Sequence, residues 1–355
     1  MKLLWLCKRF PQGRDLLTRP FGRYYYLPAA LAGGGNQIHV ALLSYRGLPA
    51  AEVVHSGVSW SGDDLLPLGL RSYLRRLNRL CSEWRPDWII GASDIYFALI
   101  AQQLSSRYSI PYAIDAYDDF EAYIPWALPL HMLWRRCVAA AALVTVPGPQ
   151  LGERLASFGA RRIGIVPMTA DPAFVPLSRV TCRAQLGLPQ ERKLIGQIGA
   201  FNARRGKHIV LDALWLVRQK RPDVTLVLSG RDSLVLHAPP EIHALGYLAD
   251  GDLPAAVNSL DVANISMADN RFCRSSYPAK LCEALACYVP VVASDLPTTR
   301  WMLSGSERAL ARIDDAQTLA KCWLARLEDD RATEIPPAPW ATHAACLYRL
   351  LSLPA

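Results

Sequence analysis

The sequence contains 355 residues, of which 51% are apolar and 20% are charged. This composition excludes a disordered chain and, at about 150 residues per domain, predicts two domains with full cores. The longest nearly continuous apolar stretch, 138–146, is shorter than the roughly 20 residues that a membrane-spanning helix needs. The apolar part of the N-terminus, 3–7, is also shorter than the core of a signal peptide, so we expect a cytoplasmic protein.

The formal net charge of +8 is concentrated in the first half of the chain. Residues 1–180 contain 19 Lys and Arg against 13 Asp and Glu, whereas residues 181–355 contain 20 against 18. A basic first half favours a polyanionic partner, either anionic lipid or nucleic acid. The nine cysteines include no C-x-x-C pair, so we predict neither a disulfide framework nor a zinc site.

The first half alternates predicted strands with predicted helices, a pattern that indicates a parallel sheet covered on both faces. A helix is predicted over 23–32, ended by Gly33–Gly35 and kinked or shortened at Pro28. The predicted strands cover 2–7, 38–44, 53–58, 88–91, 112–116, 143–146 and 163–166.

The second half repeats this alternation after the proline-rich segment 170–176, which we interpret as a linker. The predicted strands cover 193–199, 224–229, 244–246, 262–266 and 289–293, and the predicted helices cover 207–220, 253–260, 279–287, 316–327 and 342–351. We therefore predict an α/β protein with two facing, doubly wound, Rossmann-like domains, 1–175 and 176–355. The last helix is expected to pack back on the first domain. Ligands of such sheets bind at the carboxyl ends of the strands, here in the cleft between the domains.

A glycine-rich basic loop follows the first strand of the second half and opens a helix. It contains Gly199, Arg204, Arg205 and Lys207. Main-chain N–H groups and the helix dipole favour a phosphate at such a place. The spacing does not match a P-loop, because Gly199 lies too far upstream and His208 replaces the Ser or Thr. A solvated basic turn is the alternative.

A second constellation begins in the polar loop before the predicted helix 279–287. Lys280 and Glu283 lie three residues apart and hence on one helix face. They form either a surface ion pair or a ligand site, with the lysine facing a phosphate and the glutamate accepting hydrogen bonds from vicinal hydroxyls.

The stretch 283–295, EALACYVPVVASD, resembles the Glu-Ala-x-Ala-x-Gly-x-Pro-Val-Val-Ala-Ser-Asp pattern of the family-4 retaining glycosyltransferases, with Tyr288 in the glycine position. Residues 32–40 and 138–155 resemble the same family more loosely. The resemblance implies the GT-B fold, a C-terminal domain that binds a nucleoside-diphosphate sugar, and an N-terminal domain that binds the acceptor.

Carried over by motif, Glu283 matches the second glutamate of the family's Glu-x7-Glu motif, which binds the nucleotide ribose. Arg205 matches the lysine that binds the donor diphosphate. Ser275 stands in the first glutamate position and Ala200 in that of the diphosphate-binding arginine, so Arg204 or Lys207 would have to compensate. Tyr277 and Lys280 belong to a Tyr-Pro-x-Lys variant that would also contact the donor.

Cationic side chains and a helix N-terminus stabilise the charge that develops on a departing diphosphate, so we expect neither a metal nor a cofactor. Asp250-Gly251-Asp252 is a bare Asp-x-Asp sequence, the pattern that holds a metal in other glycosyltransferases. We interpret Asp252 as the N-cap of the helix that follows, with Pro254 near its entrance.

Four carboxylates crowd into residues 115–121, at the end of a predicted strand. Their repulsion would raise one pKa and create a base, so Asp118 or Asp119 is our candidate for deprotonating the acceptor hydroxyl. Loop capping and solvated charge are the alternative. Asp94 is a weaker candidate of the same kind, and His131, in an apolar run, is expected to be packed rather than catalytic.

Two segments of the first half combine apolar and basic residues. Leucines 70, 74, 77 and 80 recur at helical spacing among arginines, and 126–136 mixes Trp, Leu and Arg. Either these segments contact an anionic membrane that carries a lipid-linked acceptor, or they are ordinary helices with solvated basic faces.

The leading hypothesis is thus a sugar transferase in cell-surface polysaccharide or glycolipid synthesis. Its partners would be a nucleotide-sugar donor, a glycan or lipid-linked acceptor and a membrane surface, not nucleic acid. An inactive sugar-binding relative and a basic nucleic-acid-binding protein are the alternatives.

Overall fold

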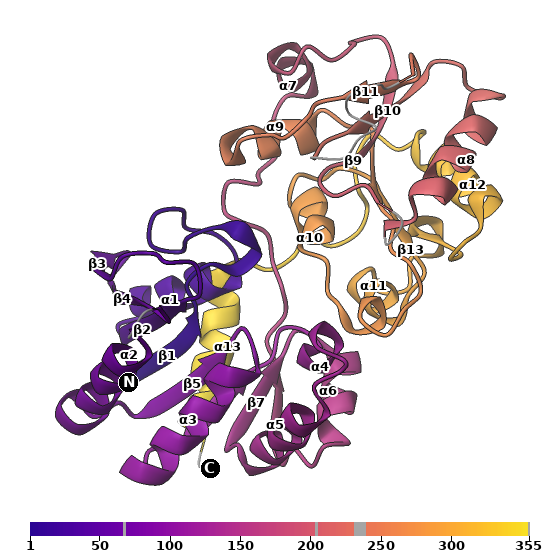
Figure 1. Ribbon diagram of the computed structural model, residues 1–355. Helices are drawn as coiled ribbons and strands as arrows, with labels where there is room; N and C mark the ends of the chain where they lie inside the picture. Colours follow the sequence, from indigo (N-terminus) through magenta and orange to yellow (C-terminus); the bar gives the residue numbers. More distant parts are fainter. Residues whose placement is uncertain (67–68, 203–204, 231–238, 354–355) are drawn as a thin grey trace. The chain divides into compact units, whose positions relative to one another are not determined.

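The computed structural model describes residues 1–66, 69–202, 205–230 and 239–353. The chain forms two compact units, shown in Figure 1. Unit 1 comprises Met1–Pro167 and Ala338–Ala355, and unit 2 comprises Met168–Pro337. The chain passes from unit 1 to unit 2 before the segment 170–176, since Ala170 and Phe174 of this segment are already buried in the core of unit 2. The chain returns to unit 1 for its last helix.

Unit 1 is built on an eight-stranded sheet in the order β3-β4-β2-β1-β5-β6-β7-β8. All neighbouring strands are parallel except β3 and β4. Continuous apolar runs such as Leu3–Cys7 suit strands that are covered on both faces. The strands are β1 (Lys2–Lys8), β2 (Gln37–Ser44), β3 (Ala51–His55), β4 (Val58–Asp64), β5 (Trp88–Ala92), β6 (Tyr112–Asp115), β7 (Leu143–Val146) and β8 (Ile163–Ile165).

The single strand predicted over 53–58 is wrong: this segment is the turn of an antiparallel hairpin between β3 and β4. Ser56 and Gly57 form the turn with φ of 51° and 72°. Two consecutive residues with positive φ reverse the chain in a way that matches the twist of the flanking strands. The valines of this segment do lie in strands, but in two different strands that the turn joins.

Helices cover both faces of the unit 1 sheet. The helices α1 (Arg23–Gly33) and α13 (Trp340–Ser352) share one core with Trp5 and Val40, and α1 runs through Pro28 without being shortened there. The other face is covered by α2 (Gly69–Arg79) and α3 (Ile95–Tyr108), and α5 (Leu128–Ala140) packs on α3. Two short helices, α4 (Phe120–Tyr123) and α6 (Pro149–Ala156), complete the unit.

Unit 2 contains a six-stranded parallel sheet in the order β11-β10-β9-β12-β13-β14. The two-residue strand β14 was not predicted, and β11 begins before the predicted segment. The strands are β9 (Lys193–Gln197), β10 (Val224–Leu228), β11 (Ile242–Ala244), β12 (Val262–Ile265), β13 (Val291–Ser294) and β14 (Leu310–Ala311). The helices are α7 (Arg179–Gln185), α8 (Lys207–Arg218), α9 (Leu253–Asn258), α10 (Ala279–Ala286), α11 (Pro297–Met302) and α12 (Ala316–Arg326).

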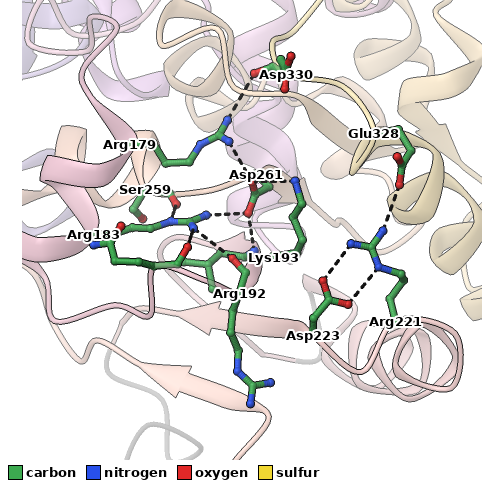
Figure 2. A network of polar contacts seen from close by, with 12 residues as sticks. Arg179, Arg183, Arg192, Lys193, Arg221, Asp223, Ser259, Asp261, Glu328 and Asp330 are labelled. Atoms are coloured by element: carbon green, nitrogen blue, oxygen red, sulfur yellow. Dashed lines mark hydrogen bonds and ion pairs between the residues drawn. The ribbon is translucent and has the colours of Figure 1, made fainter.

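An ion-pair network ties α7 to the amino edge of the unit 2 sheet (Figure 2). The buried carboxylate of Asp261, just before β12, accepts from Arg183 at 2.7 Å, from Arg179 at 3.0 Å and from the amide of Leu194 at 2.6 Å. Arg183 is buried too and also donates to the carbonyl of Ser259. A buried carboxylate with this many donors is a structural anchor, and it lies at the opposite edge from the strand ends where ligands bind.

Helices long and apolar enough to cross a bilayer do not occur among the described residues.

Candidate functional site

Three glycines follow consecutive strands at the carboxyl edge of unit 2. Gly199, Gly230 and Gly246 have φ of 111°, 124° and 66°. The amide of Gly230 donates to the carbonyl of Gly246 at 2.7 Å, and a Cβ on Gly230 would lie 2.9 Å from the carbonyl oxygen of Gly199. Positive φ and this close approach both require glycine. The glycines therefore let the ends of these strands pack closely against one another at this edge.

Lys280 reaches this edge from the first turn of α10. A Cβ on Gly199 would lie 2.5 Å from Cε and 2.8 Å from Nζ of Lys280. Lys280 and Glu283 line one small pocket together with Asn264 and Ile265 at the end of β12. Most of the other residues that line this pocket are apolar, and Gly199 is not among them. The structure thus places Lys280 against Gly199 and, separately, beside Glu283.

A buried polar network that was not predicted from the sequence lies behind this pocket. The side-chain amide of Asn264 donates to Gln197 at 2.8 Å and to Ser266 at 2.9 Å. The indole of Trp323 donates to the Asn264 carbonyl oxygen at 3.3 Å, and Gln197 donates to the carbonyl of Ala200 at 3.3 Å. The network fixes the loop after β9 to β12. The polar residues within two otherwise apolar strands, β9 and β12, were the sequence feature that could have indicated this network.

The basic loop leads into α8 beside the same strand ends. Arg204 lies outside the described residues. The amide of Arg205 donates to Asn202, and Gly206, with φ of 66°, is the N-cap of α8. Gly206 and Ser266 line a second small pocket at the ends of β12 and β13. Lys207 stands over the Phe201 ring, with Nζ 6.0 Å from its centroid. The positive end of a twelve-residue helix therefore lies at the carboxyl edge, as an anion site requires.

Ser275 and Tyr277 line neither of these two pockets. Ser275 is buried in a short 3₁₀ turn, Cys273–Ser275. The buried Tyr277 packs its ring edge-on against Trp301 of α11, with the centroids 5.7 Å apart. Both positions shape the entry to α10.

Three of the four crowded carboxylates of 115–121 are paired with arginines, so mutual repulsion is not the arrangement at these three. Asp115, 1% exposed, accepts a bidentate pair of hydrogen bonds from Arg23. Glu121 is fully buried and accepts from Arg135 at 2.8 Å and from Arg154 at 2.9 Å. Arg154 also lies 3.1 Å from the carboxylate of Asp119. Each pair places a positive charge beside a carboxylate.

Asp118 differs from its neighbours, because its contact is with a tyrosine. The hydroxyl of Tyr123 donates to the Asp118 carboxylate at 2.6 Å, and the hydroxyls of Tyr117 and Tyr123 are 3.1 Å apart. Tyr123 is 42% exposed, so this chain of hydroxyls connects a buried carboxylate to solvent at the end of β6. Of the two predicted bases, Asp118 has the geometry that fits proton transfer.

Asp94, the weaker candidate, lies in a second polar group at the ends of β1 and β5. Its carboxylate is 3.3 Å from the ammonium of Lys8 and caps α3 by accepting from the amide of Tyr96. Ser93, with φ of 73°, accepts from the amide of Lys8 at 2.8 Å. Burial raises the pKa of Asp94, and Lys8 opposes that rise. Lys8 was not predicted because its partner is distant in the sequence.

Three further predictions from the sequence concern His131, Asp252 and the absence of a metal site. His131 is buried, as expected. Asp252 occupies the N-cap position of α9, but its side chain makes no cap and accepts from Gln185 at 3.2 Å. In the described part of the chain, no group of three or more His, Cys, Asp or Glu residues is placed to hold a metal ion.

Both halves of the chain match families of one kind. Residues 24–169 match the glycosyl transferase 4-like domain, and residues 192–329 match glycosyl transferases group 1. A phosphatidyl-myo-inositol mannosyltransferase of Mycolicibacterium smegmatis is 31% identical over 153 residues, 41% of this chain and 39% of that protein. The one from Mycobacterium leprae is 30% identical over 200 residues, 51% of this chain and 50% of that protein. The chain thus aligns with half or less of these relatives.

Solved structures match over nearly the whole chain. Sucrose-phosphate synthase of Thermosynechococcus elongatus has a TM-score of 0.71 at 17% identity, over 99% of this chain and 94% of that one. HepE of Anabaena in complex with UDP has the same TM-score and identity, over 99% and 95%. At this identity the match establishes the fold, and the predicted two-domain GT-B architecture is confirmed.

Proposed function

The chain belongs to the group 1 glycosyl transferases, and from that membership we propose that it transfers a sugar from a nucleoside-diphosphate sugar to a lipid-linked or glycan acceptor. The observation that carries this proposal is the position of Lys280, which lies against Gly199 at the carboxyl edge of unit 2 and lines one pocket with Glu283. This edge lies within the residues that match the family. It supplies a cation for phosphate, with a carboxylate for vicinal hydroxyls.

We assign the donor to unit 2 and the acceptor to unit 1. Charge develops on the leaving diphosphate as the glycosidic bond breaks, and Lys280 and the N-terminus of α8 stabilise it. The acceptor hydroxyl gives up a proton near the carboxyl edge of unit 1, where the hydroxyl of Tyr123 leads to Asp118. We infer that the reaction needs no divalent metal and retains the anomeric configuration. The family resemblance of the sequence supports retention, and the cations at the donor edge support metal independence.

The relatives guide the choice of substrates to test. The mycobacterial proteins are named for mannosyl transfer to phosphatidyl-myo-inositol, and the Anabaena structure contains UDP. We therefore infer an acceptor in the glycolipid class, presented at a membrane surface in cell-surface glycolipid or polysaccharide synthesis. GDP-mannose and UDP-glucose are the first donors to try.

The test is a thermal-shift comparison of UDP, GDP and ADP and their common sugars, for the wild type and for Glu283→Ala. A ligand at about 100 times its Kd should stabilise the fold by about 2.7 kcal/mol. We expect one nucleotide to shift the wild type, a reduced shift in Glu283→Ala, and a full shift in Glu307→Ala, an exposed control. No shift with any nucleotide would overturn the proposal.

Turnover assays with the nucleotide so identified test the finer points. Activity that persists in EDTA supports metal independence, and activity lost in EDTA contradicts it. The anomeric configuration of the product, read by NMR, decides between retention and inversion.

A further inference from the structure

Four large apolar side chains are exposed within eight residues of unit 1. Trp126 is 76% exposed, Leu128 66%, Met132 58% and Leu133 48%. We call these four residues the α5 apolar face. Single exposed apolar residues are ordinary on protein surfaces, but a cluster of this kind marks an interaction site.

The exposure of this face does not come from a loosely held end. The buried His131 donates from Nε2 to the carbonyl of Ile124 at 2.9 Å. The amide of Ala127 donates to the same carbonyl at 3.0 Å. Trp134, 1% exposed, packs on Phe120 with the ring centroids 5.3 Å apart. The protein therefore holds the loop and the first turns of α5 in place while leaving their apolar side chains in solvent.

The first turns of α5 extend beyond the start of α3. Cys137 of α5 donates to the carbonyl of Ala98 of α3, so these residues are at one level. Helix α5 begins nine residues before Cys137, whereas α3 begins three residues before Ala98. At 1.5 Å per residue, α5 extends about 9 Å further along its axis. It extends past the carboxyl edge of the sheet, where Asp94 and Asp118 lie.

Positive charge accompanies the face. Arg136 follows Met132 by one helical turn and is exposed, and among the described residues we find no acidic partner for it. Helix α2 offers a contrast. Its apolar stripe is turned inward, with Tyr73 and Leu77 buried, and its exposed arginines accompany only Leu70 among exposed large apolar side chains. Leu66, just before α2, is exposed too, but the larger cluster of exposed apolar side chains is the α5 apolar face.

We propose that the α5 apolar face inserts into the headgroup region of an anionic bilayer. Trp126 and the neighbouring leucines suit the interface between headgroups and acyl chains, and Arg136 suits anionic headgroups. This docking would bring the carboxyl edge of unit 1 to the membrane that holds a lipid-linked acceptor. That purpose rests on the proposed function, whereas the docking itself can be measured without any donor.

The experiment is co-sedimentation with phosphatidylcholine vesicles that contain about 30% phosphatidylglycerol, and with phosphatidylcholine vesicles alone. We expect the wild type to prefer the anionic vesicles and the Trp126→Ser/Leu133→Ser variant to bind them about tenfold more weakly. Arg136→Gln should lose the preference for anionic lipid. Trp215→Ser is the matched control, because Trp215 of α8 is 66% exposed but belongs to unit 2.

Far-UV circular dichroism and the melting temperature of the double variant, measured without nucleotide, show whether it is folded, so weak sedimentation of a folded variant supports the proposal. Equal sedimentation of the double variant and the wild type would overturn it, as would a wild type that binds no vesicles. If light scattering shows a dimer for the wild type and a monomer for the double variant, and the wild type binds no vesicles, the face would instead be assigned to contact with a second copy of the chain. Vesicle binding without any nucleotide shift would sink the proposed function and leave the docking standing.

Discussion

The side chain of Lys280 occupies the space that a side chain at position 199 would need. A Cβ on Gly199 would lie 2.5 Å from Cε of Lys280, and the residue has a φ of 111°. Substituting Gly199 therefore strains the main chain and displaces the lysine at the same time. The loop after β9 and the first turn of α10 are coupled through this contact.

Gly199→Ala should weaken nucleotide-sugar binding at least about tenfold and destabilise unit 2 by about 1–3 kcal/mol. Lys280→Met should weaken binding with little loss of stability, because Lys280 is exposed. Titration calorimetry and chemical unfolding measure the two effects. Gly251→Ala is the control, because a Cβ there meets nothing within 4 Å. Unchanged affinity in Gly199→Ala would contradict the coupling.

The two aspartates at the end of β6 should respond differently to substitution. Asp119→Asn removes the carboxylate that faces Arg154 in the buried cluster with Glu121, so it should lower the free energy of unfolding by about 1–3 kcal/mol. Asp118→Asn keeps a hydrogen-bond acceptor for Tyr123 but cannot take up a proton. It should lower kcat by about 10²–10⁴ with a small change in stability. A variant of Asp118 with normal kcat would remove this residue from the mechanism.

The sequence predicted most of the sheet architecture, because buried parallel strands leave long apolar runs such as 2–7 and 143–146. A local motif also pointed to the edge of unit 2 that we propose binds the donor. Tyr288, matched to a glycine of that motif, has a φ of 55°, so the backbone keeps the glycine-like conformation although the residue differs. This local conformation depends on residues that are neighbours in the chain, so a single sequence is enough to predict it.

Contacts between distant residues could not be predicted in this way. The carboxylates of 115–121 suggested mutual repulsion because their partners, Arg23, Arg135 and Arg154, come from other helices. The hairpin of 51–64 was not predicted because the valines on the two sides of its turn resembled one continuous strand. The leucines of α2 and the apolar residues of 126–133 formed similar patterns in the sequence. Only burial distinguishes the inward stripe from the exposed face.

Removal of one partner of the buried pair of Arg23 and Asp115 should strongly destabilise unit 1. The Arg23 guanidinium donates to Asp115 and also to the carbonyl of Val166 at 2.8 Å, and Asp115 accepts from Thr145 at 2.8 Å. Asp115→Asn leaves a buried arginine without its counter-charge, so we expect a loss of about 3–5 kcal/mol in urea unfolding. Asp295→Asn, which breaks the exposed pair with Arg300, should cost at most about 1 kcal/mol. Equal losses would contradict the assignment.

Acid should destabilise unit 1 partly through His343. Burial and the nearby Arg23 lower the pKa of His343 to about 4, against about 6.5 in the unfolded chain. Between these values the unfolded state binds a proton that the folded state excludes, so stability falls as the pH drops from about 6.5 towards 4 and is unaffected above 7. His343→Leu should reduce the loss of unfolding free energy between pH 7 and pH 5 by about 1–2 kcal/mol. Urea unfolding at the two pH values measures this difference, with the exposed His208→Leu as the control. A His343→Leu variant that loses as much stability as the wild type would show that the acid sensitivity lies elsewhere, with His39, whose pKa burial also lowers to about 4, as the next residue to replace.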